Sequence, residues 1–426
     1  MGIEDLIARR ERLLGPGNPL FYENPVHLVR GEGVWVFDAD GRRYLDCYNN
    51  VPHVGHCHPR VVEALARQAA TLNTHTRYLH ETILDYGEQL TAMFDAPLST
   101  VAFVCTGTEA NELAMRMANF YTGGTGIICS NWGYHGNSAA VAQISTIFPP
   151  PEGIGKHIRM IPSPGTYRGP DGVTGAALAR HYADEVKRAI DGLHADGLRL
   201  SAILVDTIFS SEGLPDVPPD FMRLAVEHVR NAGGLFIADE VQPGFGRMGN
   251  HLWGYQHYGV VPDLVTLGKP MGNGHPLAGV IARPDIMSAF RNQVMYFNTF
   301  GGNPVSCAVG KAVLDVLKDE RLVDNARVVG DYVIGGLKRL QQKHDLIGDV
   351  RGRGLFFGAE LVRDGKTKEP ATEETKRLVN SMRERGVLLS RIGQYDNVLK
   401  MRPPMPFSRD HADLVLQTLD EALFAL

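Results

Sequence analysis

The stretch ADEVQPGFGR, residues 238–247, and the stretch LGKPM, residues 267–271, decide the expected fold of this chain. An apolar run before each stretch is typical of a buried strand, so two strands would deliver Asp239 and Lys269 at their carboxyl ends. Ligands bind at this edge of open α/β sheets. A lysine can form a Schiff base there, and a carboxylate can keep a pyridine nitrogen protonated. The pair therefore predicts a site for pyridoxal 5'-phosphate (PLP), although Lys269 alone would read as a solvated surface lysine and Asp239 alone as a turn cap.

Further apolar runs alternate with segments of helical spacing through the middle of the chain. The expected strands are Thr100–Cys105, Gly126–Ser130, Ala202–Asp206, Leu235–Asp239, Leu264–Leu267 and Ala278–Ala282. Helical spacing covers residues 176–193 and 220–231. Such alternation predicts an α/β fold with a large, doubly wound and mostly parallel sheet.

The pattern changes after about residue 303. Two long helical stretches lead into residues 352–361, which alternate as a half-exposed strand, and then into short strands and helices. This predicts a smaller α+β domain. We expect residues 1–60, with a hairpin at 38–41, to pack with the small domain, residues 61–305 to form the large PLP-binding domain, and residues 306–426 to form the small domain.

A third element, residues 105–112 (CTGTEANE), combines a strand end, a glycine turn and a helix start. Free amides and the helix dipole favour an anion at such a position. An ordinary capped helix explains the same residues, and a cofactor phosphate becomes the better explanation only beside Lys269 and Asp239. In WGYHG, residues 132–136, flanking glycines would leave an aromatic ring face open for stacking on a flat cofactor, or the ring would lie in the core.

The composition excludes several classes of protein. Hydrophobic residues make up 44%, charged residues 21%, and the net charge is −5, which gives no reason to expect nucleic acid or an anionic membrane as a partner. The apolar runs are too short for a membrane span, and the start of the chain predicts an amphipathic helix and no signal peptide. Five separated cysteines without a C-x-x-C motif predict reduced thiols in a cytoplasmic protein.

The segment His53-x-x-His56-Cys57-His58 has the look of a metal-ligand cluster. No second group of cysteine or histidine completes a four-ligand site, however, and His58-Pro59 is typical of a turn before a helix. We therefore expect no metal.

Together these motifs resemble the class III aminotransferases, which are fold-type I PLP enzymes. The resemblance covers nearly the whole chain and rests on residues 107–112, 134–136, 239–247, 269 and 299–304. It implies that Lys269 is the Schiff-base lysine and that Asp239 pairs with the pyridine nitrogen. It also implies that Val241 packs on one face of the ring and that Tyr134 or His135 covers the other.

The same resemblance implies that Gly107 and Thr108 bind the cofactor phosphate. Thr299 would reach the cofactor phosphate of a neighbouring subunit, so a homodimer with shared active sites is expected, alone or as half of a tetramer. Glu212 matches the family's active-site glutamate. We also expect Gln242 to reach the hydroxyl group of the pyridine ring.

A narrower resemblance links the chain to the ethanolamine-phosphate and phosphohydroxylysine phospho-lyases. It rests on residues 44–51, 53–59, 72–80 and 399–405. Many class III transaminases have an arginine three residues before the Pro-Pro pair, which grips a substrate carboxylate. Lys400 stands there in this chain, so a bidentate fork is replaced by a point charge, and Arg402 is nearby in the sequence.

The expected activity is that of a carbon–oxygen lyase that eliminates phosphate from a small phosphorylated amine. The first candidate is O-phosphoethanolamine, giving acetaldehyde, ammonia and phosphate. The expected ligands of the substrate phosphate are Asn50, Arg77, Lys400 and Arg402, although Arg77 could instead pair with Glu81 along a helix and Arg402 could be structural. The alternatives are a class III ω-aminotransferase with a keto-acid acceptor, a phosphohydroxylysine phospho-lyase, and a binding protein with a relic PLP site.

Overall fold

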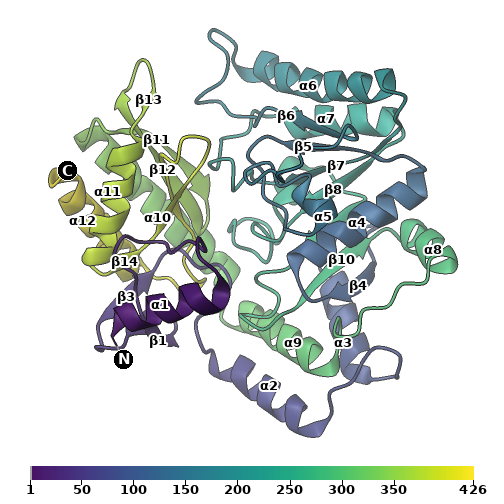
Figure 1. The fold of residues 1–426 in the computed structure, drawn as a ribbon, viewed down its shortest axis with the longest axis horizontal. Coiled ribbons are helices and arrows are strands. Elements are labelled where there is room, and N and C mark those ends of the chain that lie inside the picture. Colours follow the sequence, from purple (N-terminus) through teal and green to yellow (C-terminus); the bar gives the residue numbers. More distant parts are fainter. Residues whose placement is uncertain (1) are drawn as a thin grey trace.

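A seven-stranded sheet forms the centre of the larger unit in the computed structural model, which describes residues 2–426 (Figure 1). Its order is β4-β10-β9-β8-β7-β5-β6. The strands are β4 (Thr100–Val104), β5 (Gly126–Ser130), β6 (Ile158–Ile161), β7 (Leu200–Asp206), β8 (Leu235–Asp239), β9 (Leu264–Leu267) and β10 (Ala278–Ala282). Strands β5 to β9 are parallel, and β10 is antiparallel to both neighbours. The connection of residues 268–277 is shorter than the crossover of roughly a dozen residues that parallel strands require.

Helices cover both faces of this sheet, so its central strands are buried on both sides. Along β7, Ala202 and Leu204 pack in one apolar cluster with α4 (Gly107–Thr122), whereas Ile203 and Val205 belong to a cluster that includes α6 (Gly175–Ala195) and α7 (Phe221–Asn231). Such layering confirms the predicted doubly wound α/β architecture.

The smaller unit is built on the sheet β11-β12-β16-β15, with β13 paired to β12. Its elements are β11 (Ile347–Arg353), β12 (Phe356–Asp364), β13 (Glu369–Pro370), β15 (Ser390–Ile392), β16 (Val398–Met401), α10 (Leu322–Lys343), α11 (Thr372–Glu384) and α12 (Arg409–Phe424). The prediction of a single half-exposed strand over residues 352–361 is wrong. The chain turns at Gly354, where φ is +53°, and residues 356–361 are buried because they lie in the interior of this sheet.

The N-terminal strands lie beside the C-terminal part of the chain, as the purple and yellow-green ribbons show (Figure 1). Strands β1 (Leu28–Glu32), β2 (Trp35–Asp38) and β3 (Arg43–Asp46) form an antiparallel ribbon, and β3 pairs in parallel with β14 (Val387–Leu388). The predicted turn between β2 and β3 is confirmed, and Asp38 Oδ1 accepts a hydrogen bond from the Arg42 amide at 2.9 Å.

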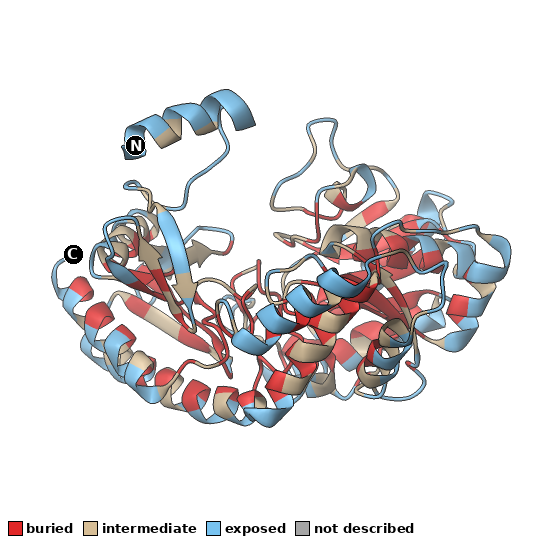
Figure 2. Cartoon of the chain, turned by 90° about the horizontal axis from the view of Figure 1, so that it is seen from below, coloured by how far each residue is buried: buried red, intermediate tan, exposed pale blue. Residues whose placement is uncertain are grey.

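The remaining helices surround these units. They are α1 (Ile3–Leu14), α2 (Pro59–Thr71), α3 (Glu81–Thr91), α5 (Ala139–Ala142), the 3-10 helix η1 (Gly254–Tyr258), α8 (Pro284–Gln293) and α9 (Pro304–Asp319). Helix α1 stands away from the body of the molecule and has no buried residue, whereas buried residues gather inside both units (Figure 2).

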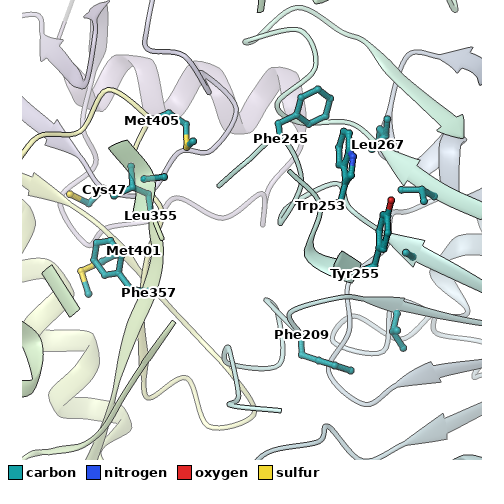
Figure 3. Close-up of a cluster of buried hydrophobic side chains, with 14 of the residues drawn as sticks. Cys47, Phe209, Phe245, Trp253, Tyr255, Leu267, Leu355, Phe357, Met401 and Met405 are labelled. Atoms are coloured by element: carbon teal, nitrogen blue, oxygen red, sulfur yellow. The ribbon is translucent and has the colours of Figure 1, made fainter. Parts of the chain in front are cut away.

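One apolar cluster spans both units. Leu355 and Met405 of the smaller unit lie on one side of it, and Phe245 and Trp253 of the larger unit lie on the other (Figure 3). The carboxyl ends of β8 and β9 therefore meet the smaller unit across a packed junction, and the candidate site lies at this junction.

Candidate active site

A cavity of about 120 Å³ lies at the carboxyl ends of the parallel strands. Its walls are Gly107, Thr108, Tyr134, His135, Gly136, Asp206, Asp239, Val241, Gln242 and Lys269. The structure thus brings together most of the residues that the sequence predicted for the cofactor.

Lys269 follows β9 and lines both this cavity and a larger one beside it. Burial of its amine and the nearby charge of Arg402 lower the pKa of Lys269 to about 8. At neutral pH the neutral fraction of the amine is therefore far larger than for an ordinary lysine, and only the neutral amine can attack a carbonyl carbon.

Asp239 ends β8 and is held by three donors. His135 Nδ1 lies 2.7 Å from Oδ2, Asn111 Nδ2 donates to Oδ2 at 3.0 Å, and the Val241 amide donates to Oδ1 at 3.0 Å. Burial raises the pKa of Asp239, but the hydrogen bond and charge of His135 outweigh burial and leave that pKa below its usual value. A permanently ionised carboxylate is what a protonated pyridine nitrogen requires.

The His135 ring links Asp239 to the interior of the site. Burial lowers the pKa of His135, but the hydrogen bond to Asp239 and the charges of Asp239, Glu212 and Asp206 raise it overall. His135 Nε2 is buried and has no hydrogen-bond partner among residues 2–426.

The first turn of α4 forms the other end of the cavity. Thr106 caps the helix by accepting from the Glu109 amide, and the Glu109 side chain accepts from the Thr106 amide in return. The amides of Gly107 and Thr108, at the first two helical positions, have no carbonyl to bond within the helix. These amides, the helix dipole and the Thr108 hydroxyl suit a phosphate group.

Glycines make room for the apolar wall of the cavity. A Cβ atom at Gly107 would lie 3.1 Å from Val241 Cγ1, and one at Gly268 would lie 3.2 Å from the same atom. Val241 therefore reaches the cavity only because both neighbours lack side chains. A flat ring with an anionic arm would suit this cradle, in which Asp239 could hold the ring nitrogen, Val241 could pack on the ring and the start of α4 could hold the arm.

Glu212 lies close to His135 but lines a neighbouring cavity. Its Oε1 accepts a hydrogen bond from the Ser130 hydroxyl, and its Oε2 is buried without a partner among residues 2–426. Burial and the negative charge of Asp206 raise the pKa of Glu212 to about 7.

The larger cavity, of about 1100 Å³, contains the cationic residues Lys400 and Arg402 beside Lys269. Lys400 is only 3% exposed and Arg402 only 6%, and neither forms an ion pair with any carboxylate among residues 2–426. Both contact the Oε1 atom of Gln242, with Arg402 Nη1 donating to it and Lys400 Nζ lying 3.4 Å away.

The positive charges of Lys400 and Arg402 repel each other in this arrangement. Burial first, and then the charge of Arg402, hold the pKa of Lys400 well below its usual value. Burial also lowers the pKa of Arg402. The predicted ligand Asn50 is buried, and its side-chain amide donates to the Gln242 carbonyl oxygen at 3.5 Å, but Asn50 lines neither of the two cavities that contain Lys269.

Two predicted site residues lie elsewhere in the single chain. Arg77 is exposed and covers the Phe297 ring at 4.4 Å, and Thr299 is exposed beside Phe300. Neither lines the two cavities that contain Lys269.

Two residues of the site escaped the sequence analysis. Asn111 donates to both Asp239 and the His135 carbonyl oxygen, the latter at 2.7 Å, and Asp206 ends β7 within the cavity. Asp206 could have been found by the rule that found Asp239, because both end apolar strands. Asn111 could not, because an asparagine inside a helix gives no such signal.

A family model described as aminotransferase class-III matches residues 21–423. The chain belongs to the class III aminotransferase family. This confirms the resemblance drawn from the motifs, the fold-type I architecture, and PLP as the cofactor.

Relatives in this family carry two kinds of name. The alanine–glyoxylate aminotransferase 2-like protein of Drosophila melanogaster is 42% identical over 99% of this chain and 87% of the relative. The ethanolamine-phosphate phospho-lyase homolog 1 of Caenorhabditis elegans is 36% identical over 99% of this chain and 93% of the relative. A solved structure of an Arthrobacter phospholyase in complex with phosphoethanolamine is 46% identical, with a TM-score of 0.96 over 99% of this chain and 100% of that chain.

Two further observations bear on the expected partners. None of the helices in residues 2–426 combines the length and the apolar character that a membrane crossing requires. Over the same part of the chain, histidine, cysteine and acidic side chains do not gather in any group of three that could hold a metal ion.

Proposed function

We propose that the chain is a cytoplasmic, PLP-dependent phospho-lyase that eliminates phosphate from a small phosphorylated amine. O-phosphoethanolamine is the first candidate substrate. The observation that carries this proposal is the pair Lys400 and Arg402, two buried cations that share one neutral acceptor, Gln242 Oε1, in the cavity of Lys269. The phosphoethanolamine complex of the Arthrobacter relative supports the same substrate class, and five free thiols suit a reducing compartment.

The energetics of this pair favour a doubly charged ligand. Burying an unpaired charge is costly, and Lys400 and Arg402 also repel each other. A phosphate dianion would offset both costs, because it can accept hydrogen bonds from the two cations at once. A carboxylate carries one charge and two coplanar oxygens, and it suits the planar fork of an arginine better than a lysine at this position.

The residues of the chain divide the chemistry between them. When bound, PLP withdraws electrons from the carbon that bears the substrate nitrogen. We assign Lys269 the removal of a proton from that carbon, and Asp239 the task of keeping the pyridine nitrogen protonated. Lys400 and Arg402 then stabilise negative charge on the departing phosphate, which is where preorganised cations contribute most to catalysis.

The overall reaction is balanced with one water molecule. The C–H bond beside nitrogen and the C–O bond to phosphate break, and a carbon–carbon double bond forms in the amine product. Water then hydrolyses this unsaturated amine at the carbon that bears nitrogen. Phosphoethanolamine and water therefore give acetaldehyde, ammonia and phosphate. No oxidant or amino acceptor is consumed.

We propose further that two copies of the chain share their active sites. Exposed apolar side chains gather in residues 72–84 and 295–300, namely Leu72, Tyr78, Leu79, Leu84, Met295, Phe297 and Phe300. Exposed apolar clusters of this kind are typical of interfaces. Arg77 and Thr299 belong to the same segments. If a second copy covers this surface, Arg77 and Thr299 of each copy come to lie at the interface, where they can reach the active site of the other copy.

A class III aminotransferase is the second candidate, because relatives of comparable identity carry that name. A decisive experiment incubates the enzyme with phosphoethanolamine, with and without pyruvate, and measures phosphate, acetaldehyde and alanine. Phosphate and acetaldehyde released without pyruvate support the lyase. Alanine formed without phosphate would reject it, and a parallel assay with 5-phosphohydroxylysine decides between the two phosphorylated amines.

A further inference from the structure

The three histidines of the segment 53–58 have three separate partners. His56 Nε2 lies 2.8 Å from Asp46 Oδ2, and His58 Nε2 lies 2.9 Å from Glu320 Oε1. His53 is completely buried and contacts the guanidinium group of Arg247 instead of a carboxylate. A buried histidine beside a cation calls for its own explanation.

The hydrogen bonds of His53 define its protonation. Nε2 lies 2.8 Å from the Phe245 carbonyl oxygen, which can only accept, so Nε2 carries the proton. Nδ1 then has a lone pair and accepts from Arg247 Nη2 at 3.1 Å. Burial and the charge of Arg247 hold the pKa of His53 well below its usual value, so His53 is a neutral acceptor with one fixed tautomer.

Arg247 is the central residue of this junction. It is completely buried, and Nη1 donates to the carbonyl oxygens of Leu355 at 3.0 Å and Pro403 at 2.7 Å. It forms no ion pair among residues 2–426, and burial with the charge of Arg402 lowers the pKa of Arg247 to about 9. Its planar fork thus joins three segments through neutral acceptors only.

Two segments at this junction carry polar groups that line the substrate cavity, namely the loop of Arg247 itself and the segment of Pro403. Pro403 directly follows Arg402, and Gln242 lies in the same loop as Phe245 and Arg247. The His53 carbonyl oxygen accepts from the Met405 amide at 2.8 Å, which ties the N-terminal segment to the same strand end. The apolar side chains around this junction include Phe245, Leu355 and Met405 (Figure 3).

We infer that His53 and Arg247 are positioning residues for the substrate phosphate, because together they set how Arg402 and Gln242 lie relative to each other; this inference rests on the proposed function. Arg402 donates through Nε to the Tyr48 carbonyl oxygen at 2.7 Å, and its amide donates to the Cys47 carbonyl oxygen at 2.8 Å. The backbone on the other side of Arg402 is held by the bond from Arg247 to Pro403 and, two residues further on, by the bond from the Met405 amide to the His53 carbonyl oxygen. Loss of the His53 acceptor would free one arm of Arg247 and let this backbone shift.

The test compares His53→Asn with His53→Leu, two side chains of nearly equal shape. Asparagine can place an acceptor where Nδ1 lies, whereas leucine has none. We expect His53→Leu to weaken binding of inorganic phosphate to the holoenzyme about tenfold, as one hydrogen bond to a charged group would. His53→Asn should stay within about threefold of the wild type. Calorimetry measures the binding, and kcat/KM for phosphoethanolamine should fall in parallel, because the same groups are proposed to hold the departing phosphate.

Two controls separate positioning from a general loss of structure. The absorbance spectrum of bound PLP should be the same in both variants, because neither touches the cofactor cavity. Arg247→Lys, which keeps the charge but lacks the fork, should weaken phosphate binding as His53→Leu does, and it serves if His53→Leu fails to fold.

Two results would overturn the inference. One is a His53→Leu or Arg247→Lys holoenzyme that binds phosphate as tightly as the wild type. The other is a His53→Asn enzyme that loses as much affinity as His53→Leu. The proposed function is tested separately by the wild-type enzyme, since it fails only if that enzyme releases no phosphate from phosphoethanolamine.

Discussion

Replacing Lys400 by methionine should lower activity and raise stability at the same time. Methionine nearly matches the length of lysine and removes the charge of a side chain that is 3% exposed and has no carboxylate partner among residues 2–426. A buried cation that binds a phosphate dianion is worth about 3 kcal/mol to the bound state. Each 1.36 kcal/mol of lost stabilisation lowers the rate tenfold, so kcat/KM for phosphoethanolamine should fall about 150-fold.

The effect on stability has the opposite sign. In the free enzyme Lys400 is buried beside Arg402, and burial and that repulsion hold its pKa well below the usual value. Lysine therefore costs stability in the folded state, while methionine adds apolar burial beside Phe356, whose ring lies 5.5 Å from Nζ. We expect the free energy of unfolding to rise by about 1 kcal/mol, measured as denaturant-induced unfolding without phosphate.

The matched control is Lys376→Met, because Lys376 lines the same cavity but is half-exposed and ion-paired with Glu23 at 2.9 Å. Exposed ion pairs contribute less than about 1 kcal/mol, so its kcat/KM should stay within about threefold of the wild type. Equal losses in the two variants, or a Lys400→Met enzyme that is less stable than the wild type, would refute the reasoning. Either result would mean that Lys400 serves packing or the general charge of the cavity.

Four further outcomes follow from the site, at Lys269, Asp239, Arg77 and Thr299. Combination of the cofactor-free protein with PLP should speed up as pH rises through about 8, where Lys269 loses its proton, and Lys269→Ala should abolish the bound-cofactor absorbance. Asp239→Asn removes the negative charge that His135 faces, and it should lower kcat about 100-fold while PLP still binds, as single-turnover assays can show. Arg77→Ala should raise KM for phosphoethanolamine, and an unchanged KM would remove Arg77 from the site. Thr299→Ala should raise the dissociation constant of PLP measured by dialysis, without changing the mass of the proposed dimer in ultracentrifugation.

Much of the fold could be predicted from the sequence because buried parallel strands are continuous apolar runs. The strand bounds from Gly126–Ser130 to Ala278–Ala282 agree closely with the structure. An apolar run looks the same in either direction, however, so the reversal of β10 could not be read from it. The turn at Gly354 was not predicted, because a glycine inside a run predicted to alternate does not by itself reveal the positive φ of a turn.

The candidate site was predictable only where one strand delivers one residue. Asp239 and Lys269 end neighbouring strands, so sheet topology alone brings them together. The contacts of Gln242 with Lys400 and Arg402 join residues 158 and 160 positions apart, and no local pattern encodes them. His53 resembled a metal ligand because spacing in a turn does not fix the direction of a side chain.

Under the proposed function, the choice between elimination and amino transfer depends on charge outside the cofactor cavity. Lys269 and Asp239 serve either reaction, because both begin with loss of a proton beside the amine. Elimination additionally requires that a leaving phosphate be stabilised, and in the proposed mechanism Lys400 and Arg402 are held in place for this task before the substrate arrives. Without a dianion, the repulsion between Lys400 and Arg402 is unrelieved. A phosphorylated ligand should therefore stabilise this protein against unfolding in proportion to RT ln(1 + [L]/Kd), and a simple carboxylate at the same concentration should do so much less.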